Sequence, residues 1–152
     1  MYITLLQLSR NLNFYSKIGL KDSFETRIYL MFIHFSIILI IFKRKKNNFP
    51  QNEYDNLFFC IENNLRELGL GDVGVNKKMK ELNKIFYDIL LKLNSEDLNF
   101  KINKDLIFKY FENLNANNDK YMYFEDYFVN FYNFCFELSP QTMIKGILNF
   151  KG

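Results

Sequence analysis

The sequence predicts an all-α fold: a single compact bundle of about six or seven helices, with residues 1–152 forming one domain. Hydrophobic residues make up 49% of the 152 positions, which suffices for a core and excludes a disordered chain. Only two prolines and six glycines interrupt the chain, so long elements are expected. Apolar residues recur every three or four positions, and no segment alternates with the period of a β-strand.

Three helices are predicted in the first half of the chain. The first covers residues 2–17 and ends before Gly19, with the apolar positions Leu5, Leu8, Leu12 and Tyr15. The second runs from residue 22 to about residue 45, with Asp22 and Glu25 forming a capping box at its start. A break at residues 47–52 precedes the third, whose apolar stripe is Tyr54, Leu57, Phe58, Ile61, Leu65 and Leu68.

The second half shows the clearest periodicity. The fourth helix begins after Asp72 and buries Val75, Met79, Leu82, Phe86, Ile89 and Leu93. Residues 94–103 are predicted to form a loop. A fifth helix covers about residues 106–114 and a sixth about residues 121–138. Ser139 and Pro140 then start a short helix that runs to about residue 150.

The most apolar stretch, residues 28–42, is a candidate membrane span. As a helix it measures about 22 Å, shorter than a hydrocarbon core of about 30 Å, so a buried core helix is the favoured interpretation. The basic cluster that follows, Lys43, Arg44, Lys45 and Lys46, is a candidate contact with anionic lipid headgroups. His34, inside the stretch, is interpreted as a packed core residue, with a haem axial ligand as the alternative.

The remaining chemistry points away from an enzyme. The one histidine and the two cysteines, Cys60 and Cys135, form no metal-ligand cluster, and neither cysteine has an evident base partner. We therefore predict no catalytic residue, no metal and no cofactor. The cysteines lie in different predicted elements and form no disulfide framework, which favours a reducing cytoplasm. The net charge of +3 is weak for a nucleic-acid binder, so a nucleic-acid partner is not expected.

A glycine-rich segment joins the third and fourth helices. Gly69, Gly71 and Gly74 could suggest a phosphate-binding loop, but no strand precedes them and no Lys-Ser/Thr pair follows. We interpret the segment as a tight turn in which glycines supply positive φ and Asp72 caps the next helix.

The run from Asn64 to Val75, followed by Lys77, Lys78, Met79 and Lys80, resembles the signature of the ubiquinol–cytochrome c chaperone family. Other family features follow in the same order: Phe14-Tyr15, Gly19-Leu20, Arg27, His34, Phe86-Tyr87 and Ile144-Lys145-Gly146 with Phe150. On this resemblance, which covers about residues 2–150, the chain is identified as a bacterial member of the family.

The resemblance implies a chaperone that binds newly made cytochrome b, or another subunit of ubiquinol–cytochrome c reductase, and supports assembly of that respiratory complex. It also implies a small helical co-chaperone as a further partner. We expect a cytoplasmic protein, peripheral on the inner face of the cytoplasmic membrane. The hypothetical partner-binding residues are Arg66, Glu67, Gly69, Gly71, Asp72, Gly74, Lys77, Lys78 and Lys80.

Two alternatives stay open at this point. Arg66 could pair internally with Glu62 or Asp72, and the lysines could form a merely solvated helix face. The rival function is a basic helical RNA- or ribosome-binding module that uses residues 43–46 and 77–84, whose affinity would fall steeply with salt.

Overall fold

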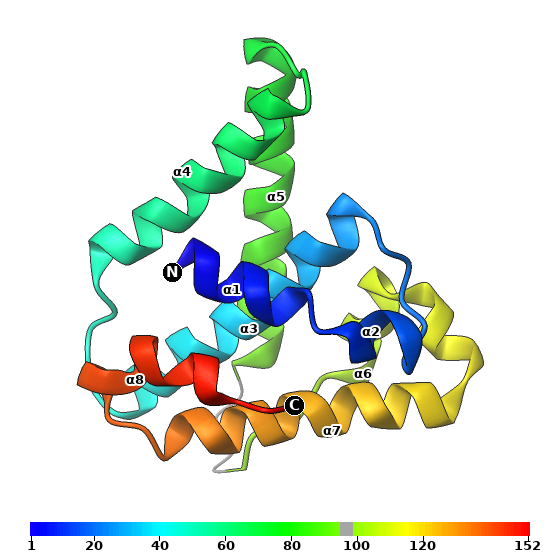
Figure 1. Ribbon diagram of the computed structural model, residues 1–152, viewed down its shortest axis with the longest axis vertical. Coiled ribbons are helices and arrows are strands. Elements are labelled where there is room, and N and C mark those ends of the chain that lie inside the picture. The colour runs from blue at the N-terminus through cyan, green and yellow to red at the C-terminus, as the bar shows by residue number, and fades with distance from the viewer. Residues whose placement is uncertain (95–98) are drawn as a thin grey trace.

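The computed structural model describes residues 1–94 and 99–152, and within these ranges the chain forms helices and no β-strand (Figure 1). The predicted all-α class is therefore confirmed. Of the predicted loop at 94–103, residues 95–98 lie outside the described part. The helices are α1 (Tyr2–Ser9), α2 (Leu12–Ser16), α3 (Phe24–Arg44), α4 (Gln51–Glu67), α5 (Asp72–Leu93), α6 (Lys104–Tyr110), α7 (Asn118–Phe136) and α8 (Pro140–Gly146), with short 3-10 helices η1 (Glu112–Ala116) and η2 (Ile147–Asn149).

Helix α3 lies at the centre of the core. Helices α1, α5 and α7 pack against it, and its side chains are buried nearly all round. Its length and hydropathy would allow it to cross a membrane, but 67% of its most apolar window is buried inside the protein. A helix that is hydrophobic on every side has to be covered by other elements of the protein. The interpretation of residues 28–42 as a buried core helix is confirmed.

The start of α3 differs from the prediction by one residue. The backbone N–H of Thr26 donates to Ser23 Oγ at 3.2 Å, so Ser23 is the N-cap. Asp22 instead accepts from the guanidinium of Arg27 at 2.5 Å. The capping box centred on Asp22 is wrong because the neighbouring serine is an equally good cap and leaves the carboxylate to the arginine.

Two predicted helices are each divided in two. Residues 2–17 form α1 and α2, because Asn11 accepts a hydrogen bond from the backbone N–H of Asn13 and starts a new helix. Leu12 is consequently 77% exposed and not in the core. The predicted fifth helix ends at Tyr110, where Phe111 takes an extended φ of −133° before η1 begins.

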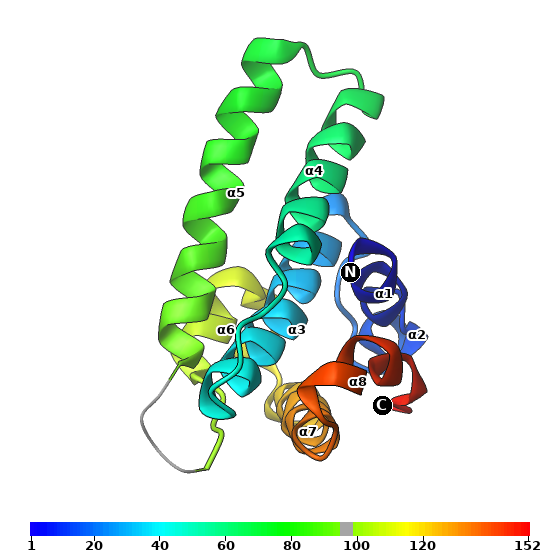
Figure 2. The same cartoon turned by 90° about the vertical axis from the view of Figure 1, so that its left-hand side faces the viewer.

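Helices α4 and α5 form an antiparallel hairpin that projects from the body. Figures 1 and 2 both show the end of α4 and the start of α5 standing beyond the other helices. Nearer the body, α5 packs on α3, and α4 packs on α5 and α1. The hairpin buries Leu57, Ile61, Leu65, Val75, Leu82, Phe86, Ile89 and Leu93. Its connecting turn therefore lies at one extreme of the molecule.

Candidate functional site

The turn between α4 and α5, residues 66–74, exposes aliphatic side chains; we call this segment the hairpin tip. Leu68, Leu70 and Val73 are 63%, 41% and 85% exposed. Leu68 was predicted to extend the buried stripe of the third helix, and that prediction is wrong: α4 ends at Glu67, and Leu68 borders an open pocket beside α1 and α3 without being covered by them. Grouped apolar side chains that stay in water are typical of surfaces that bind another molecule.

A pair of carboxylates holds the guanidinium of Arg66 across the tip. One guanidinium nitrogen donates to Asp72, the first residue of α5, and another donates to Glu62 at 3.3 Å. The hydrogen bond that Arg66 donates to Asp72 raises the pKa of the Arg66 side chain. Of the two roles left open for Arg66, internal pairing is therefore observed, and it links the end of α4 to the start of α5. Glu67, the last residue of α4, is exposed beside it.

The three glycines of the tip differ in backbone conformation. Gly69 has φ of +92°, a conformation that strains any residue with a Cβ. Gly71 has φ of −72° and Gly74 lies inside α5, so positive φ is confirmed for Gly69 alone. A Cβ added at Gly69 or Gly71 would meet no atom within 4 Å, which leaves the backbone there open to an approaching partner.

The predicted capping role of Asp72 is wrong. Gly71 occupies the N-cap of α5, no side chain caps this helix end, and Asp72 lies in the first turn. Its carboxylate is turned to Arg66, because an ion pair across the turn competes with the backbone amides for the same oxygen atoms. A negative charge in the first turn still favours the helix dipole.

The lysines that follow the tip divide into two kinds. Lys78 Nζ lies 3.5 Å from Glu81 and 3.9 Å from Glu25. The second of these ion pairs links α5 to the start of α3. Lys77 and Lys80 are exposed and form no ion pair with any described residue. Two of the three predicted contact lysines are thus available to a partner.

The candidate membrane-surface cluster lies at the other end of α4. Lys45 Nζ donates to the carbonyl oxygens of Leu138, at 2.6 Å, and Phe136, and Arg44 donates to Tyr132 at 2.7 Å. These two residues tie the end of α3 to α7 and the turn after it, whereas Lys43 and Lys46 are exposed.

The basic cluster at 43–46 and the lysines near the tip lie toward opposite ends of α4. Helix α4 has 17 residues, so its two ends are about 25 Å apart at 1.5 Å per residue. The RNA-binding alternative, which uses residues 43–46 and 77–84, would therefore require a ligand that reaches across this distance.

His34 is fully buried and both of its ring nitrogens are occupied. Nδ1 lies 2.7 Å from the carbonyl oxygen of Leu30, which can only accept, so Nδ1 carries the proton. Tyr127 then donates its hydroxyl to Nε2 at 2.8 Å. Burial lowers the pKa of His34 to about 3, so the ring is neutral. The interpretation as a packed, hydrogen-bonded core residue is confirmed.

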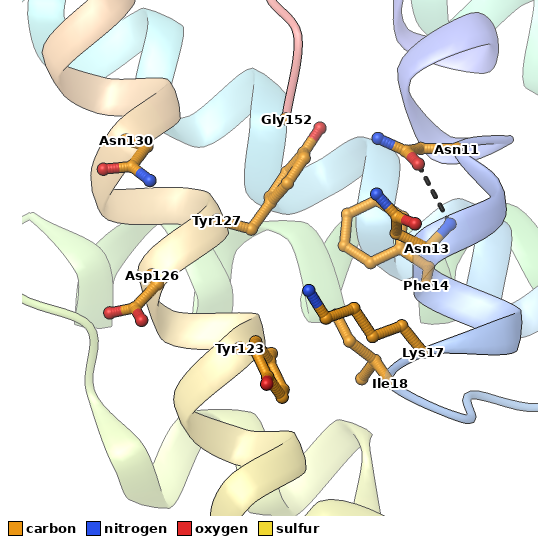
Figure 3. Close-up of a pocket in the computed structure, with 10 residues that line it drawn as sticks. All are labelled: Asn11, Asn13, Phe14, Lys17, Ile18, Tyr123, Asp126, Tyr127, Asn130 and Gly152. Carbon is orange, nitrogen blue, oxygen red and sulfur yellow. Dashed lines mark hydrogen bonds between the residues drawn. The ribbon is translucent and has the colours of Figure 1, made fainter.

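A cavity of about 170 Å³ lies between α2 and α7 (Figure 3). Among its side chains are one ammonium, Lys17, and one carboxylate, Asp126, and no His, Cys or Ser lines it. Figure 3 shows these two groups on separate walls, and Lys17 Nζ sits 4.2 Å from the centre of the Tyr123 ring. The lining lacks the paired nucleophile and base that covalent catalysis requires. Across the described residues, no three of His, Cys, Asp and Glu cluster as metal ligands.

Sequence reasoning found the charged and glycine residues of the tip but missed its aliphatic ones. Leu70 and Val73 fall outside the apolar periodicity of both helices, since Val75 is the first buried residue of α5. Apolar residues that break the periodicity of the neighbouring helices were the sequence signal that could have identified the aliphatic side chains of the tip.

Comparison with known proteins supports the resemblance. The family model described as ubiquinol-cytochrome C chaperone matches residues 16–101, more than half of the chain, and this stretch includes α3, both helices of the hairpin and its tip. No curated protein and no solved structure gives a significant match.

Proposed function

The chain belongs to the ubiquinol–cytochrome c chaperone family, and from this membership we propose that the hairpin tip binds cytochrome b before the subunit joins its complex. The family supports a chaperone role in assembly of ubiquinol–cytochrome c reductase and an interaction with components of that complex. The proposal adds which subunit is bound and where. A small helical co-chaperone is the further partner that we propose.

The observation that carries the proposal is the exposure of Leu68, Leu70 and Val73 at the extreme of the molecule. An unassembled membrane subunit exposes apolar segments that its partners will later cover. Aliphatic side chains on a projecting turn can shield such a segment, and the gain is about 25 cal/mol for each Å² of apolar surface removed from water.

The small size of the tip suits a reversible contact. Three aliphatic side chains cover far less than the roughly 1,200–2,000 Å² of a stable protein–protein interface. A chaperone has to release its client when the partner subunits arrive, so modest affinity is an advantage. Glu67 and the exposed part of Arg66 would add orientation at the rim, where charges set specificity more than affinity.

We also propose that the protein works in the cytoplasm, on the inner face of the cytoplasmic membrane. The exposed residues Lys43 and Lys46 would face anionic headgroups, each contributing about 1 kcal/mol near the surface. Because this cluster and the tip are about 25 Å apart, one could touch lipid while the other holds the client.

Affinity purification from detergent-solubilised membranes tests the proposal. The tagged protein should retain cytochrome b, detected by its mass and by haem absorbance. The paired substitution Leu68→Ser/Val73→Ser should remove most of the retained cytochrome b, because it replaces two apolar side chains of the tip by polar ones. Both residues are exposed, so their replacement leaves the core unchanged.

The matched control is Leu12→Ser/Leu148→Ser, which changes two exposed leucines (77% and 46% exposed) on α2 and η2. Equal loss of cytochrome b from both variants would mean that general surface hydrophobicity is responsible and that the tip is not the binding site. Absence of cytochrome b from the wild-type sample would reject the proposed client.

A further inference from the structure

Helix α5 carries an ordered row of exposed residues along the side opposite its buried face. The row consists of Lys77, Lys80, Lys84, Tyr87 and Leu91, which we call the outer stripe. The residues are spaced three, four, three and four positions apart, and residues with that spacing lie in a row along one side of a helix. Figure 2 shows no other helix beside the outer side of α5.

The three lysines of the outer stripe, at its end nearer the tip, form no ion pair with the described part of the chain. None of Lys77, Lys80 and Lys84 forms an ion pair within the described residues. The acidic residues of α5 nearby are already engaged: Glu81 lies 3.5 Å from Lys78, and Asp88 binds Lys92 at 2.8 Å. Three exposed lysines therefore lie in a row with no ion pair to any described residue.

Exposed apolar surface lies on both sides of the three lysines. Tyr87 and Leu91, at the far end of the outer stripe, are 59% and 73% exposed, and Val73 of the tip, four positions before Lys77, is 85% exposed. The distance from Val73 to Leu91 along the helix is about 27 Å, or five turns. A surface that served only to keep the helix in solution would not need exposed aliphatic residues at both ends of a basic row.

From this pattern we propose that the outer stripe of α5 pairs with an acidic amphipathic helix of the client protein. The partner helix would place apolar side chains against Val73 and against Tyr87 and Leu91, and carboxylates opposite the three lysines. The lysine stems would lie along the partner while their ammonium groups meet its carboxylates. This inference rests on the proposed function, because it specifies the segment that the client presents once it has reached the tip.

A zero-length carbodiimide cross-linker tests the chemistry directly, since it joins an ammonium to a carboxylate only when the two are in contact. The complex captured from solubilised membranes is treated with the reagent and its cross-linked peptides are sequenced. Lys80 and Lys84 should each be joined to an Asp or Glu of the client, and those acids should lie three or four positions apart. Cross-links to acids with no helical spacing, or none at these two lysines, would overturn the inference.

Charge reversal provides an independent test. Lys80→Glu/Lys84→Glu should lower client capture about tenfold, and the wild-type complex should weaken as salt rises from about 0.05 to 0.5 M, because exposed charges are screened. The matched control Lys21→Glu/Lys145→Glu makes the same change in net charge on exposed lysines outside α5 and should retain capture. Equal capture by both charge variants would overturn the inference about the outer stripe. If the Leu68→Ser/Val73→Ser variant still lost cytochrome b in that case, the proposed function of the tip would stand without the outer stripe.

A nucleic acid is the other polyanion that could lie on the outer stripe, and nuclease treatment distinguishes it. Client capture and the lysine–carboxylate cross-links should survive digestion of RNA. Loss of capture after digestion would show that RNA bridges the two proteins and would overturn the acidic-helix inference.

Discussion

The neutral state of His34 makes a quantitative prediction about stability and pH. In the folded protein burial lowers the pKa of this imidazole to about 3, against 6.5 in an unfolded chain. The unfolded state therefore binds more protons than the folded state between pH 6.5 and pH 3. The free energy of unfolding should accordingly be greatest above pH 6.5 and fall as the pH drops through this window.

The expected size follows from the same two pKa values. One pKa unit corresponds to 1.36 kcal/mol, so lowering the pH from about 7 to about 5 should cost about 2 kcal/mol of stability. At about 2–4 °C per kcal/mol for a chain of this size, the melting temperature should fall by about 4–8 °C. Because His34 is the only histidine in the sequence, this window reports mainly on one residue.

Urea unfolding at the two pH values, followed by circular dichroism, measures the effect. The variant His34→Gln has no imidazole to titrate, so its stability should change little between about pH 7 and pH 5, whatever its absolute value. Parallel losses in the wild type and in His34→Gln would refute the argument that a buried neutral imidazole controls this part of the pH profile.

Four further substitutions test the tip and the rest of the fold, each by denaturant unfolding. Gly69→Ala should destabilise by about 1–2 kcal/mol because of its positive φ, whereas Gly71→Ala, with negative φ and open space, should stay within about 1 kcal/mol of the wild type. Asp88→Asn should cost about 1–3 kcal/mol at neutral pH, since it loses the charged hydrogen bonds from Lys92 and Lys109. These bonds, that from Lys92 first, lower the pKa of the Asp88 carboxyl, so the difference in stability should disappear in acid as the wild-type carboxyl is protonated. Phe14→Ala, which empties a ring from the packed aromatic core, should cost about 3–5 kcal/mol.

Much of the fold follows from periodicity, because a long helix that packs on one side must repeat apolar residues at helical spacing. Helix α5 illustrates this: five of its six predicted core residues are buried, and Met79 is partly buried. The division of residues 2–17 into two helices was missed because Asn11 was read as part of a continuous helix, although its side chain favours a helix start. Local capping competes with periodicity over short segments, and the periodicity of Leu12 gave no warning of its exposure.

The candidate site was predictable in its position and only partly in its contacts. The family signature located the turn, but no sequence pattern decides whether Arg66 binds a partner or Asp72, since that depends on how the chain reverses at Gly69. The sequence also does not show that Lys78 forms an ion pair with Glu25 of another helix while its neighbour Lys77 forms none with any described residue. Long-range pairs of this kind depend on how the helices pack, which composition and spacing leave open.

Site-specific photo-cross-linking tests the central claim, that the hairpin tip is the surface that contacts the client, most directly. A photoreactive amino acid replaces Val73, 85% exposed at the tip, or Leu12, 77% exposed on α2, in cells that assemble ubiquinol–cytochrome c reductase. Position 73 should give a strong adduct with newly made cytochrome b and position 12 little or none. An adduct of equal yield at both positions, or one at position 12 alone, would contradict the assignment of the tip as the docking surface.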